Sequence, residues 1–552
     1  MVFTRLHSML NSYLCLKGRG GRYNTNTLVK GVMLMNRNYK KIAALMLCSG
    51  LVLTACGGGN NAKESNSSNG GTDSTAKTTA APADVLDAKA KISWLNILQT
   101  STTPTGPILD KIEELTNTEI EFSWIPDPSK EERINTSLAS NSLADIVTLT
   151  ILDNSSVRNA LKAGMFWEVS PYLDEFPNLA KISQDTRTSA SIAGKLYGVP
   201  FQKSLARNGV VLRKDWLDKL GLQVPKTTDE LMEVAKAFTE KDPDGNGKKD
   251  TTGFMDRSDL VYGAFKTLGS YFGTPNYWSV DDAGKMTPEF DTEAYVKTMD
   301  YMKTLYDGGY INQDFAVTAK TDQQQNFAQG KAGIYVGALF DSKNLLNLSK
   351  GIQDGMDLVM VNDITSTGNE ADRAIWAGNN GIGGLLSFPK SEVKDENELR
   401  RILKFVNDLM NEDVYGLMTY GIKDVHYTID GEQAVTIKDT DLWKQEVQPF
   451  SASRPLENGF IIHDADPLKV EADKLIVENA KYAVLNPAYS LESETYSTQG
   501  SELQKIMTDA TYKYILGKID LDGFKAEVEK WKKSGGSKII TEYEAAYKAV
   551  NP

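Results

Sequence analysis

The sequence predicts an α/β protein with more than one lobe. Strand-like and helix-like segments alternate along residues 92–150, which is typical of a lobe built on a largely parallel sheet. A second α/β stretch begins near residue 209, and the 552 residues exceed what one hydrophobic core usually serves. A hydrophobic content of 41% with 24% charged residues indicates a globular chain and argues against a disordered or fibrous one.

Five segments make up the first α/β stretch. Residues 92–98, 120–125 and 145–150 are apolar runs of strand length. Residues 108–115 and about 130–140 lie between these runs and repeat apolar side chains at helical spacing. We therefore expect the order strand, helix, strand, helix, strand.

The second α/β stretch opens with a predicted strand at residues 209–213. We find no internal repeat, and no later apolar segment has the length of a membrane span. Amphipathic helices are expected near residues 229–239, 292–307, 399–410 and 502–516.

The first 55 residues have the composition of a secretory leader, with eight Lys or Arg and no Asp or Glu. Basic residues at 37–41 precede an apolar run at 42–53. This run is too short for a bilayer span of about 20 residues and suits the core of a signal peptide. Met33 or Met35 is a more natural start, so we interpret residues 1–32 as an over-extended gene start.

The apolar run ends in Leu53-Thr54-Ala55-Cys56, which resembles the lipobox of bacterial lipoproteins. The resemblance implies that the Cys56 sulfur receives diacylglyceryl and that Cys56 becomes the mature N-terminus; the alternative is a short buried helix with an incidental cysteine. Residues 57–88 are rich in Gly, Ser, Thr and Asn and predict a flexible linker. We expect a lipid-anchored body at the extracellular face of the cell membrane.

Cleavage before Cys56 changes the charge and cysteine counts. The whole chain carries a formal charge of −12, whereas the chain without its leader has 53 Lys and Arg against 73 Asp and Glu, a net charge of −20. This surplus argues against nucleic acid as a partner, because phosphate binding needs an excess of Lys and Arg. Cys15 and Cys48 leave with the leader, so no disulfide framework or zinc-ligand spacing is left.

An acidic loop at residues 242–253 has the spacing of a calcium site. Oxygen-bearing side chains stand at loop positions 1, 3, 5 and 9, with Gly247 at position 6, as in an EF-hand loop. Position 12, normally Glu, is Gly253, so the loop is not a complete EF-hand; the alternative is a solvated turn that binds nothing. The expected ligands of a structural calcium ion are Asp242, Asp244, Asn246 and Asp250, with the backbone carbonyl of Lys248.

Six segments occur in one order along the body of the chain. They are GKLYGVPF (194–201), VLRKDWLDKLGLQVP (211–225), TDELM (228–232), YINQDF (310–315), FAQGKAG (327–333) and YGIKDVHY (420–427).

This ordered set resembles the extracellular solute-binding lipoproteins of family 1, the sugar-binding subunits of ABC importers in Gram-positive bacteria. The resemblance implies a periplasmic-binding-protein-like fold, with two α/β lobes, a hinge and a ligand held in the interlobe cleft. The first lobe is expected over 89–206 plus 385–450 and the second over 207–384 plus 451–552. Members of the family carry a similar calcium loop, usually closed by an acidic residue where this chain has Thr251.

Candidate sugar-binding residues combine aromatic platforms with polar planar groups, since sugar rings offer an apolar face and hydroxyl edges. Two loop-like segments, TPNYWS (274–279) and WAGNNG (376–381), have this character, and simple loop packing is an equal alternative for them. A structural histidine and a surface arginine are the alternatives for the His and for the arginine at 454. The candidates are Trp278, Tyr277, Trp376, Arg207, Asn208, His426, Tyr427 and Arg454.

The sequence argues against an enzyme. Without the leader the chain has only His426 and His463, its one Cys is the expected site of lipidation, and no nucleophile or zinc motif occurs. A carboxylate pair for glycoside hydrolysis stays open because Asp and Glu are abundant.

We therefore expect the monomeric substrate-binding lipoprotein of an ABC importer, which captures an oligosaccharide and delivers it to ABC permease subunits. The alternatives are a surface polysaccharide-binding adhesin and a membrane-anchored glycoside hydrolase. The choice among pectic, alginate, xylan and mannan fragments stays open.

Overall fold

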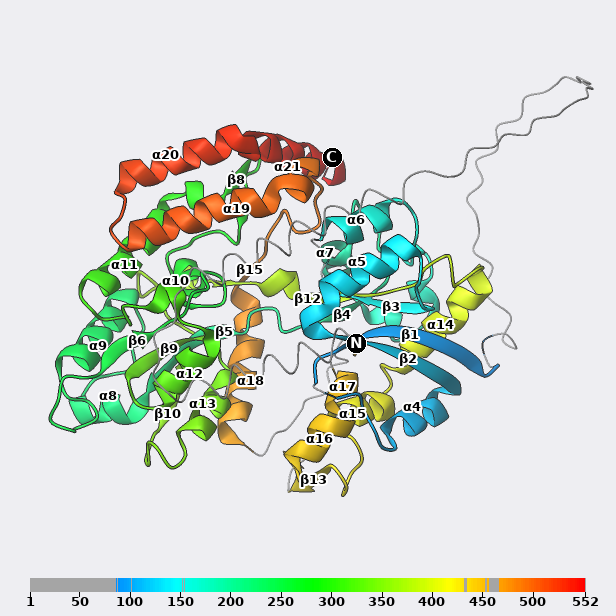
Figure 1. The fold of residues 1–552 in the computed structure, drawn as a ribbon, viewed down its shortest axis with the longest axis horizontal. Coiled ribbons are helices and arrows are strands. Elements are labelled where there is room, and N and C mark those ends of the chain that lie inside the picture. The colour runs from blue at the N-terminus through cyan, green and yellow to red at the C-terminus, as the bar shows by residue number, and fades with distance from the viewer. Residues whose placement is uncertain are drawn as a thin grey trace, which may run out of the picture. The chain divides into compact units, whose positions relative to one another are not determined.

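The computed structural model describes residues 86, 88–100, 102–150, 152, 154–430, 434–451, 454–455 and 466–551. Cys56, the leader and most of the expected linker lie outside the described residues. Two mixed sheets organise the described chain, each with its own helices (Figure 1). The core around the first sheet draws on residues 90–201 and 382–450, and the larger core around the second draws on residues 206–376 and 488–543.

The first sheet has the strand order β2-β1-β3-β12-β4. β1 pairs in parallel with β2 and β3, as the alternating sequence pattern predicts. β12 enters from much later in the chain and is antiparallel to both β3 and β4, so the sheet is mixed. Its strands are β1 (Ala90–Leu98), β2 (Thr118–Pro126), β3 (Ile146–Leu149), β4 (Val199–Gln202) and β12 (Ile382–Ser387).

The second sheet has the order β10-β5-β9-β6, with β5 antiparallel to both of its neighbours and β9 parallel to β6. Val210 and Leu212 of β5 enter one core while Val211 enters another, because successive side chains of a strand point to opposite faces. Both faces of this sheet are therefore buried. Its strands are β5 (Asn208–Arg213), β6 (Thr252–Met255), β9 (Ala332–Ala338) and β10 (Leu358–Val361).

The predicted helices form, although the one expected at 502–516 begins eight residues earlier as α19. Helices with buried residues in the first core are α4 (Ile108–Thr116), α5 (Lys130–Ser140), α6 (Ser155–Lys162), α7 (Gln184–Ala190), α14 (Glu396–Asp408), α15 (Glu412–Tyr420) and α17 (Gln448–Ser451), with α16 (Thr440–Glu446) beside α17. The helices that accompany the second sheet are α8 (Lys214–Leu220), α9 (Thr228–Glu240), α10 (Ala264–Tyr271), α11 (Glu293–Asp307), α12 (Lys320–Ala328), α13 (Asp341–Ser349), α18 (Pro467–Asn479), α19 (Glu494–Ile515), α20 (Leu521–Trp531) and α21 (Ser537–Val550).

Three small two-stranded ladders complete the described structure: β7 (Trp278–Val280) with β8 (Met286–Pro288), β11 (Ile375–Trp376) with β15 (Ala483–Val484), and β13 (Tyr427–Asp430) with β14 (Ala434–Ile437).

Two segments that connect the sheets run side by side. Residues 203–207 lead from β4 to β5, and the short helix η7 (Gly378–Gly381) leads back to β12. The Lys203 amide donates to the Gly381 carbonyl at 2.9 Å, and the Gly378 amide donates to the Leu205 carbonyl at 3.0 Å. The two connections are thus hydrogen-bonded to each other.

Candidate functional site

A groove of about 410 Å³ lies at one end of the second sheet. The parallel strands β6 and β9 both end there: Arg257 follows β6, and Ala338 is the last residue of β9. Arg207, at the end of the first connection between the sheets, also lines the groove. The carboxyl ends of strands are where open α/β sheets bind ligands, which makes this groove a candidate site.

Aromatic rings and a cation meet in the groove. The Arg207 guanidinium lies 5.8 Å from the ring centroids of both Tyr262 and Phe340. These rings are 38% and 37% exposed, so each retains surface on which a sugar can stack. Within the described part of the chain, Arg207 makes no ion pair with a carboxylate.

Arg257 offers a second donor from deeper in the groove. The residue is 8% exposed, and its Nη2 donates to the Tyr262 carbonyl. Its buried Nε has no hydrogen-bond partner among the described residues. A buried N–H without a partner costs about 1–3 kcal/mol, so an acceptor from a ligand would be stabilised here.

Among the described residues that line the groove, three cations (Arg207, Arg257 and Lys320) stand against two aspartates (Asp259 and Asp341), a surplus of one positive charge. Asp259 lies 3.7 Å from the Arg257 guanidinium. Asp341 accepts from the Tyr335 hydroxyl at 2.7 Å and lies 3.5 Å from the Lys320 ammonium. The two aspartates thus face Arg257 and Lys320, and Arg207 remains available to an anionic group.

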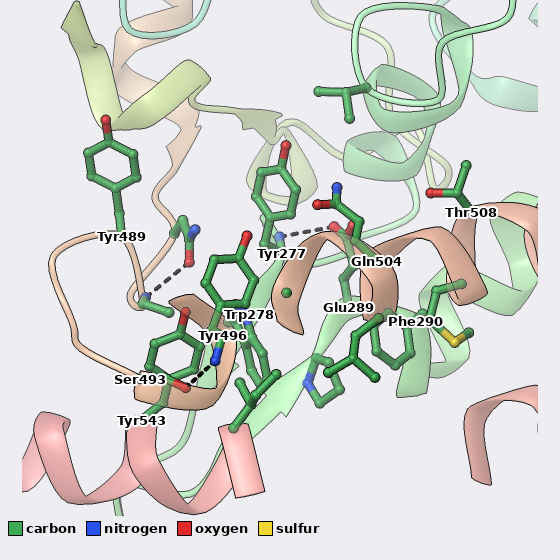
Figure 2. A pocket seen from close by; sticks show the side chains of 18 of the residues that line it. Tyr277, Trp278, Glu289, Phe290, Tyr489, Ser493, Tyr496, Gln504, Thr508 and Tyr543 are labelled. Atoms are coloured by element: carbon green, nitrogen blue, oxygen red, sulfur yellow. Dashed lines mark hydrogen bonds between the residues drawn. The ribbon is translucent and has the colours of Figure 1, made fainter. Parts of the chain in front are cut away.

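A second cavity, of about 260 Å³, lies among aromatic side chains; we call it the aromatic cavity (Figure 2). It is lined by the hairpin β7–β8, by residues of helices α6, α10, α11, α19, α20 and α21, and by the chain just before α19. Its aromatic lining residues include Tyr277, Trp278, Phe290, Tyr489, Tyr496 and Tyr543.

One buried ion pair supports this cavity. The Lys266 ammonium lies 2.7 Å from Glu289 Oε2, and the same oxygen accepts from the Tyr277 amide at 2.9 Å, the latter drawn as a dashed line in Figure 2. The ammonium also lies 3.5 Å from the Tyr277 ring centroid. Burial lowers the pKa of Lys266, and Glu289 opposes this shift by stabilising the charged form.

Tyr277 stands in a backbone conformation that bulky residues rarely adopt, with φ of 62°. Its amide is bound by Glu289 and its ring is covered by the Lys266 ammonium. Together these contacts hold a strained residue, which is a feature of ligand sites.

Trp376 lies between the groove and the aromatic cavity. Its indole meets the Tyr262 ring edge-on, with centroids 5.6 Å apart, and lies 6.0 Å from the Lys266 ammonium. Its Nε1 donates to Thr267 Oγ1 at 3.1 Å. A continuous run of rings and cations therefore joins the two cavities, in the order Phe340, Arg207, Tyr262, Trp376, Lys266 and Tyr277.

Five sequence candidates gather in this region: Arg207 and Asn208 line the groove, Tyr277 and Trp278 line the aromatic cavity, and Trp376 lies between. Trp278 and Trp376 are only 8% and 5% exposed, and Trp278 packs 5.1 Å from Tyr543. Packing thus accounts for much of their surface, and their contact with a sugar stays a prediction.

The other three candidates lie in neither cavity. His426 is fully buried: its Nδ1 accepts from the Ile422 amide at 3.0 Å, and its Nε2 lies 3.1 Å from Glu446. The Tyr427 ring lies 5.5 Å from Tyr420. The Arg454 guanidinium covers the Tyr415 ring at 4.8 Å, and its Nε donates to the Ser451 carbonyl. Their role as ligand contacts also stays a prediction.

Sequence reasoning missed several residues of the two cavities, chiefly Arg257, Tyr262, Phe340, Lys266 and Glu289. A prediction of the four-residue strand β6 would have pointed to two of them, because Arg257 and Tyr262 follow its carboxyl end, where open α/β sheets bind ligands.

The acidic loop is ordered by its own hydrogen bonds. Asp242 Oδ1 accepts from the amides of Gly245 and Asn246, and its Oδ2 accepts from the amide of Gly247 at 2.9 Å. These bonds, the Gly247 bond above all, lower the pKa of Asp242, whereas burial chiefly raises the pKa of Asp244. Gly245 and Gly247 both have φ of 78°, which permits the tight turns.

The side chain of Asn246 brings the remaining carboxylates together. Its Nδ2 donates to Asp244 at 2.7 Å and to Asp250 at 3.0 Å, so the positive end of an amide dipole lies where the carboxylates converge. Thr251 is buried and its Oγ1 donates to the Phe238 carbonyl, so it supplies no oxygen to the loop. The donors are hard oxygens of the kind that calcium prefers. Within the described ranges, no group of three or more His, Cys, Asp or Glu has the arrangement of a metal site as it stands.

In the part of the chain that the structure covers, none of the helices is both long and apolar enough to pass through a membrane.

Comparison with other proteins identifies relatives over most of the chain. Residues 99–383 match the family model described as bacterial extracellular solute-binding protein. The polygalacturonan/rhamnogalacturonan-binding protein YtcQ of Bacillus subtilis (strain 168) is 46% identical over 92% of this chain and 98% of its own length. Lipoprotein LipO of the same organism is 31% identical over 80% of this chain and 89% of its own length.

Solved structures share the fold at lower identity. An HMO-binding, ABC-transporter-associated solute-binding protein of Bifidobacterium longum infantis superposes with a TM-score of 0.67, at 18% identity over 84% of this chain and 99% of its own. An EF-hand mutant of the Streptococcus pneumoniae ABC-transporter substrate-binding protein FusA, in complex with fructo-nystose, has a TM-score of 0.61 at 18% identity, over 84% of this chain and 99% of its own.

These matches confirm the resemblance predicted from sequence, and with it a solute-binding rather than a catalytic role. The chain belongs to the family of bacterial extracellular solute-binding proteins.

Proposed function

We propose that this chain is the substrate-binding lipoprotein of an ABC importer, which captures an oligosaccharide and delivers it to the membrane permease. The observation that carries the proposal is the groove at the carboxyl ends of β6 and β9. Among the described residues, two partly exposed aromatic residues meet there with an arginine that has no carboxylate partner and with a buried N–H that has no acceptor. Rings for the sugar faces and donors for its oxygens are what carbohydrate recognition requires.

The ligand is an oligosaccharide that carries carboxylates. The positive charge of Arg207 favours an anion, as does the Arg257 Nε that finds no acceptor among the described residues, because a guanidinium forms strong bonds with a carboxylate. The relative YtcQ, at 46% identity, is named for binding polygalacturonan and rhamnogalacturonan, polymers that contain galacturonate. Among the fragments left open by sequence, pectic ones therefore have the best support.

Binding closes two lobes. We assign residues 89–206 plus 385–450 to the first and residues 207–384 plus 451–552 to the second, with 203–207 and Gly378–Gly381 as hinge segments. The hydrogen bonds between these two segments support this role, since a paired ribbon can bend as a unit. The ligand shifts the population toward the closed form, which the permease recognises.

Cys56 carries the lipid that holds the monomeric receptor at the extracellular face of the cell membrane, and residues 57–88 form the linker. The name of the relative LipO, a lipoprotein, supports this anchor.

The acidic loop holds a structural calcium ion through Asp242, Asp244, Asn246, the Lys248 carbonyl and Asp250. The donor chemistry of the loop supports this role, as does the EF-hand named in FusA, a protein of the same fold. When bound, the ion supplies positive charge that holds three carboxylates together.

Small-angle scattering of the protein with and without oligosaccharides tests the proposal. We expect oligogalacturonates to reduce the radius of gyration, and neutral xylan and mannan fragments to leave it unchanged. An adhesin would bind the same ligands without compaction, and a glycoside hydrolase would shorten them, which chromatography of the recovered sugar detects. Absence of compaction with every ligand would contradict the importer.

A further inference from the structure

We infer that the aromatic cavity is a subsite for an uncharged sugar residue of the same oligosaccharide whose carboxylate is bound in the groove. This inference rests on the proposed function and adds to it a division of the ligand into a charged and an uncharged part.

The charged groups that face the aromatic cavity are already paired. Lys266 lies 2.7 Å from Glu289 and is covered on another side by the Tyr277 ring. The Arg158 guanidinium donates to Glu492 at 2.8 Å through Nε and to the Leu491 carbonyl at 2.9 Å through Nη2. A ligand carboxylate would meet Glu289, and the two cations among the described lining residues, Arg158 and Lys266, are already paired, so the cavity favours a neutral sugar unit.

The walls of the cavity have the chemistry of a sugar subsite. Its rings offer stacking surfaces, and the hydroxyl groups of Tyr277, Tyr489 and Tyr496 point toward the same side in Figure 2. Gln504 of α19 adds an exposed amide to this lining. Apolar faces and polar edges are thus presented together.

The position of Tyr277 is fixed before any ligand arrives. Glu289 binds its amide and Lys266 covers its ring, so the two charged residues maintain the strained φ of 62°. We regard Lys266 and Glu289 as positioning residues, because they hold the tyrosine in place and pair with each other.

The run of contacts through Trp376 connects the two sites. Tyr262 lines the groove, Lys266 lines the aromatic cavity, and Trp376 contacts both. An oligosaccharide that reaches both sites would place its carboxylate beside Arg207 and another of its sugar units beside Tyr277.

Calorimetric titration with two probes tests the inference. One probe is trigalacturonate, in which every residue is charged; the other is a tetrasaccharide of alternating galacturonate and rhamnose, in which every second residue is neutral. We expect the wild-type protein to bind the mixed probe at least tenfold more tightly than trigalacturonate.

Two variants separate the subsites. Ser497→Phe places a ring into the aromatic cavity from α19, and Tyr489→Ala removes one of its walls; melting curves without ligand establish that each variant folds. We expect both to weaken the mixed probe about tenfold and to leave trigalacturonate within twofold. Unchanged binding of the mixed probe by both folded variants, or an equal loss for both probes, would overturn the subsite. If the wild-type protein binds neither probe, the proposed function itself is overturned instead.

Discussion

The groove and the aromatic cavity use the same kinds of residue in opposite ways. In the groove, Arg207 lacks a carboxylate partner within the described chain, and its flanking rings are more than a third exposed. In the aromatic cavity, Lys266 is paired with Glu289, and Trp278 is 8% exposed. The comparison teaches that the same residue types differ in whether their charge is already paired, and this difference underlies the proposed division into an anion site and a neutral subsite.

The largest expected effect is on stability, and it should occur at the cavity. Lys266→Met leaves the Glu289 carboxylate, 17% exposed, without its cation. Removing one partner of a buried ion pair costs about 3–5 kcal/mol, so we expect a loss of that size in the free energy of unfolding, measured by urea denaturation. The matched control is Lys297→Met, which breaks an exposed pair with Glu293 and should cost less than about 1 kcal/mol. Equal losses in the two variants would remove the contrast between the sites.

The next effect concerns the dependence of stability on pH at the start of α10, the helix that carries Lys266. Asp256 Oδ1 accepts from the Ala264 amide at the start of α10, and burial raises the pKa of Asp256 from 3.8 to about 6. Between these values the folded state binds the proton more tightly than the unfolded state, so stability falls as pH rises from about 4 to 6. The full cost, reached above pH 6, is about 3 kcal/mol.

Asp256→Asn keeps an acceptor for Ala264 and removes the titration. We therefore expect urea denaturation between pH 4 and 7 to show a flatter dependence on pH in this variant. Asp322→Asn, an exposed aspartate on α12, is the control and should keep the wild-type slope. A slope in Asp256→Asn equal to that of the wild type would show that another group is responsible.

At the groove we expect a smaller effect, on the free energy of ligand binding and not on the free energy of unfolding. Arg207→Ala removes the available cation, and we expect affinity for trigalacturonate to fall about 10–100-fold in calorimetry, since hydrogen bonds to charged groups contribute about 1.5–3 kcal/mol. Lys525→Ala removes the same charge from an exposed position on α20 and should change affinity less than twofold. Similar losses in both variants would indicate attraction by net charge rather than a built site.

The smallest effect is expected at the acidic loop, which lines neither cavity. At ten times its dissociation constant, calcium should stabilise the protein by about 1.4 kcal/mol, seen as a higher melting temperature. Asp250→Asn should reduce this shift, and magnesium, which demands a tighter octahedral site, should give less. Affinity for trigalacturonate should not depend on calcium. No change in melting temperature at millimolar calcium would disprove the ion site.

Local sequence patterns predicted much of the fold. The apolar runs at 92–98, 120–125 and 145–150 became β1, β2 and β3, because the pattern of apolar side chains along a strand is local in the sequence. β12 was missed as the partner of β3, since its pairing joins segments far apart in the chain. Sequence showed that Thr251 supplies no carboxylate, but its inward hydrogen bond to the Phe238 carbonyl depends on tertiary packing.

The site was less predictable for the same reason. Trp278 and Trp376 were chosen because their neighbours are polar, yet Trp278 is covered by Trp531 and Tyr543 from the C-terminal helices. Arg207 was chosen for its place near a chain crossing, and the structure does place it in the groove. The sequence does not reveal which cations form ion pairs with carboxylates, because the partner lies in another element of the fold, as Glu289 does for Lys266.

The central claim is that the groove recognises a sugar carboxylate through Arg207. The most direct test is a calorimetric titration of the wild-type protein with trigalacturonate and with its fully methyl-esterified form, which differ in charge and share every ring and hydroxyl. We predict at least tenfold tighter binding of the free acid, about 1.4 kcal/mol or more. Equal or tighter binding of the ester would contradict the claim.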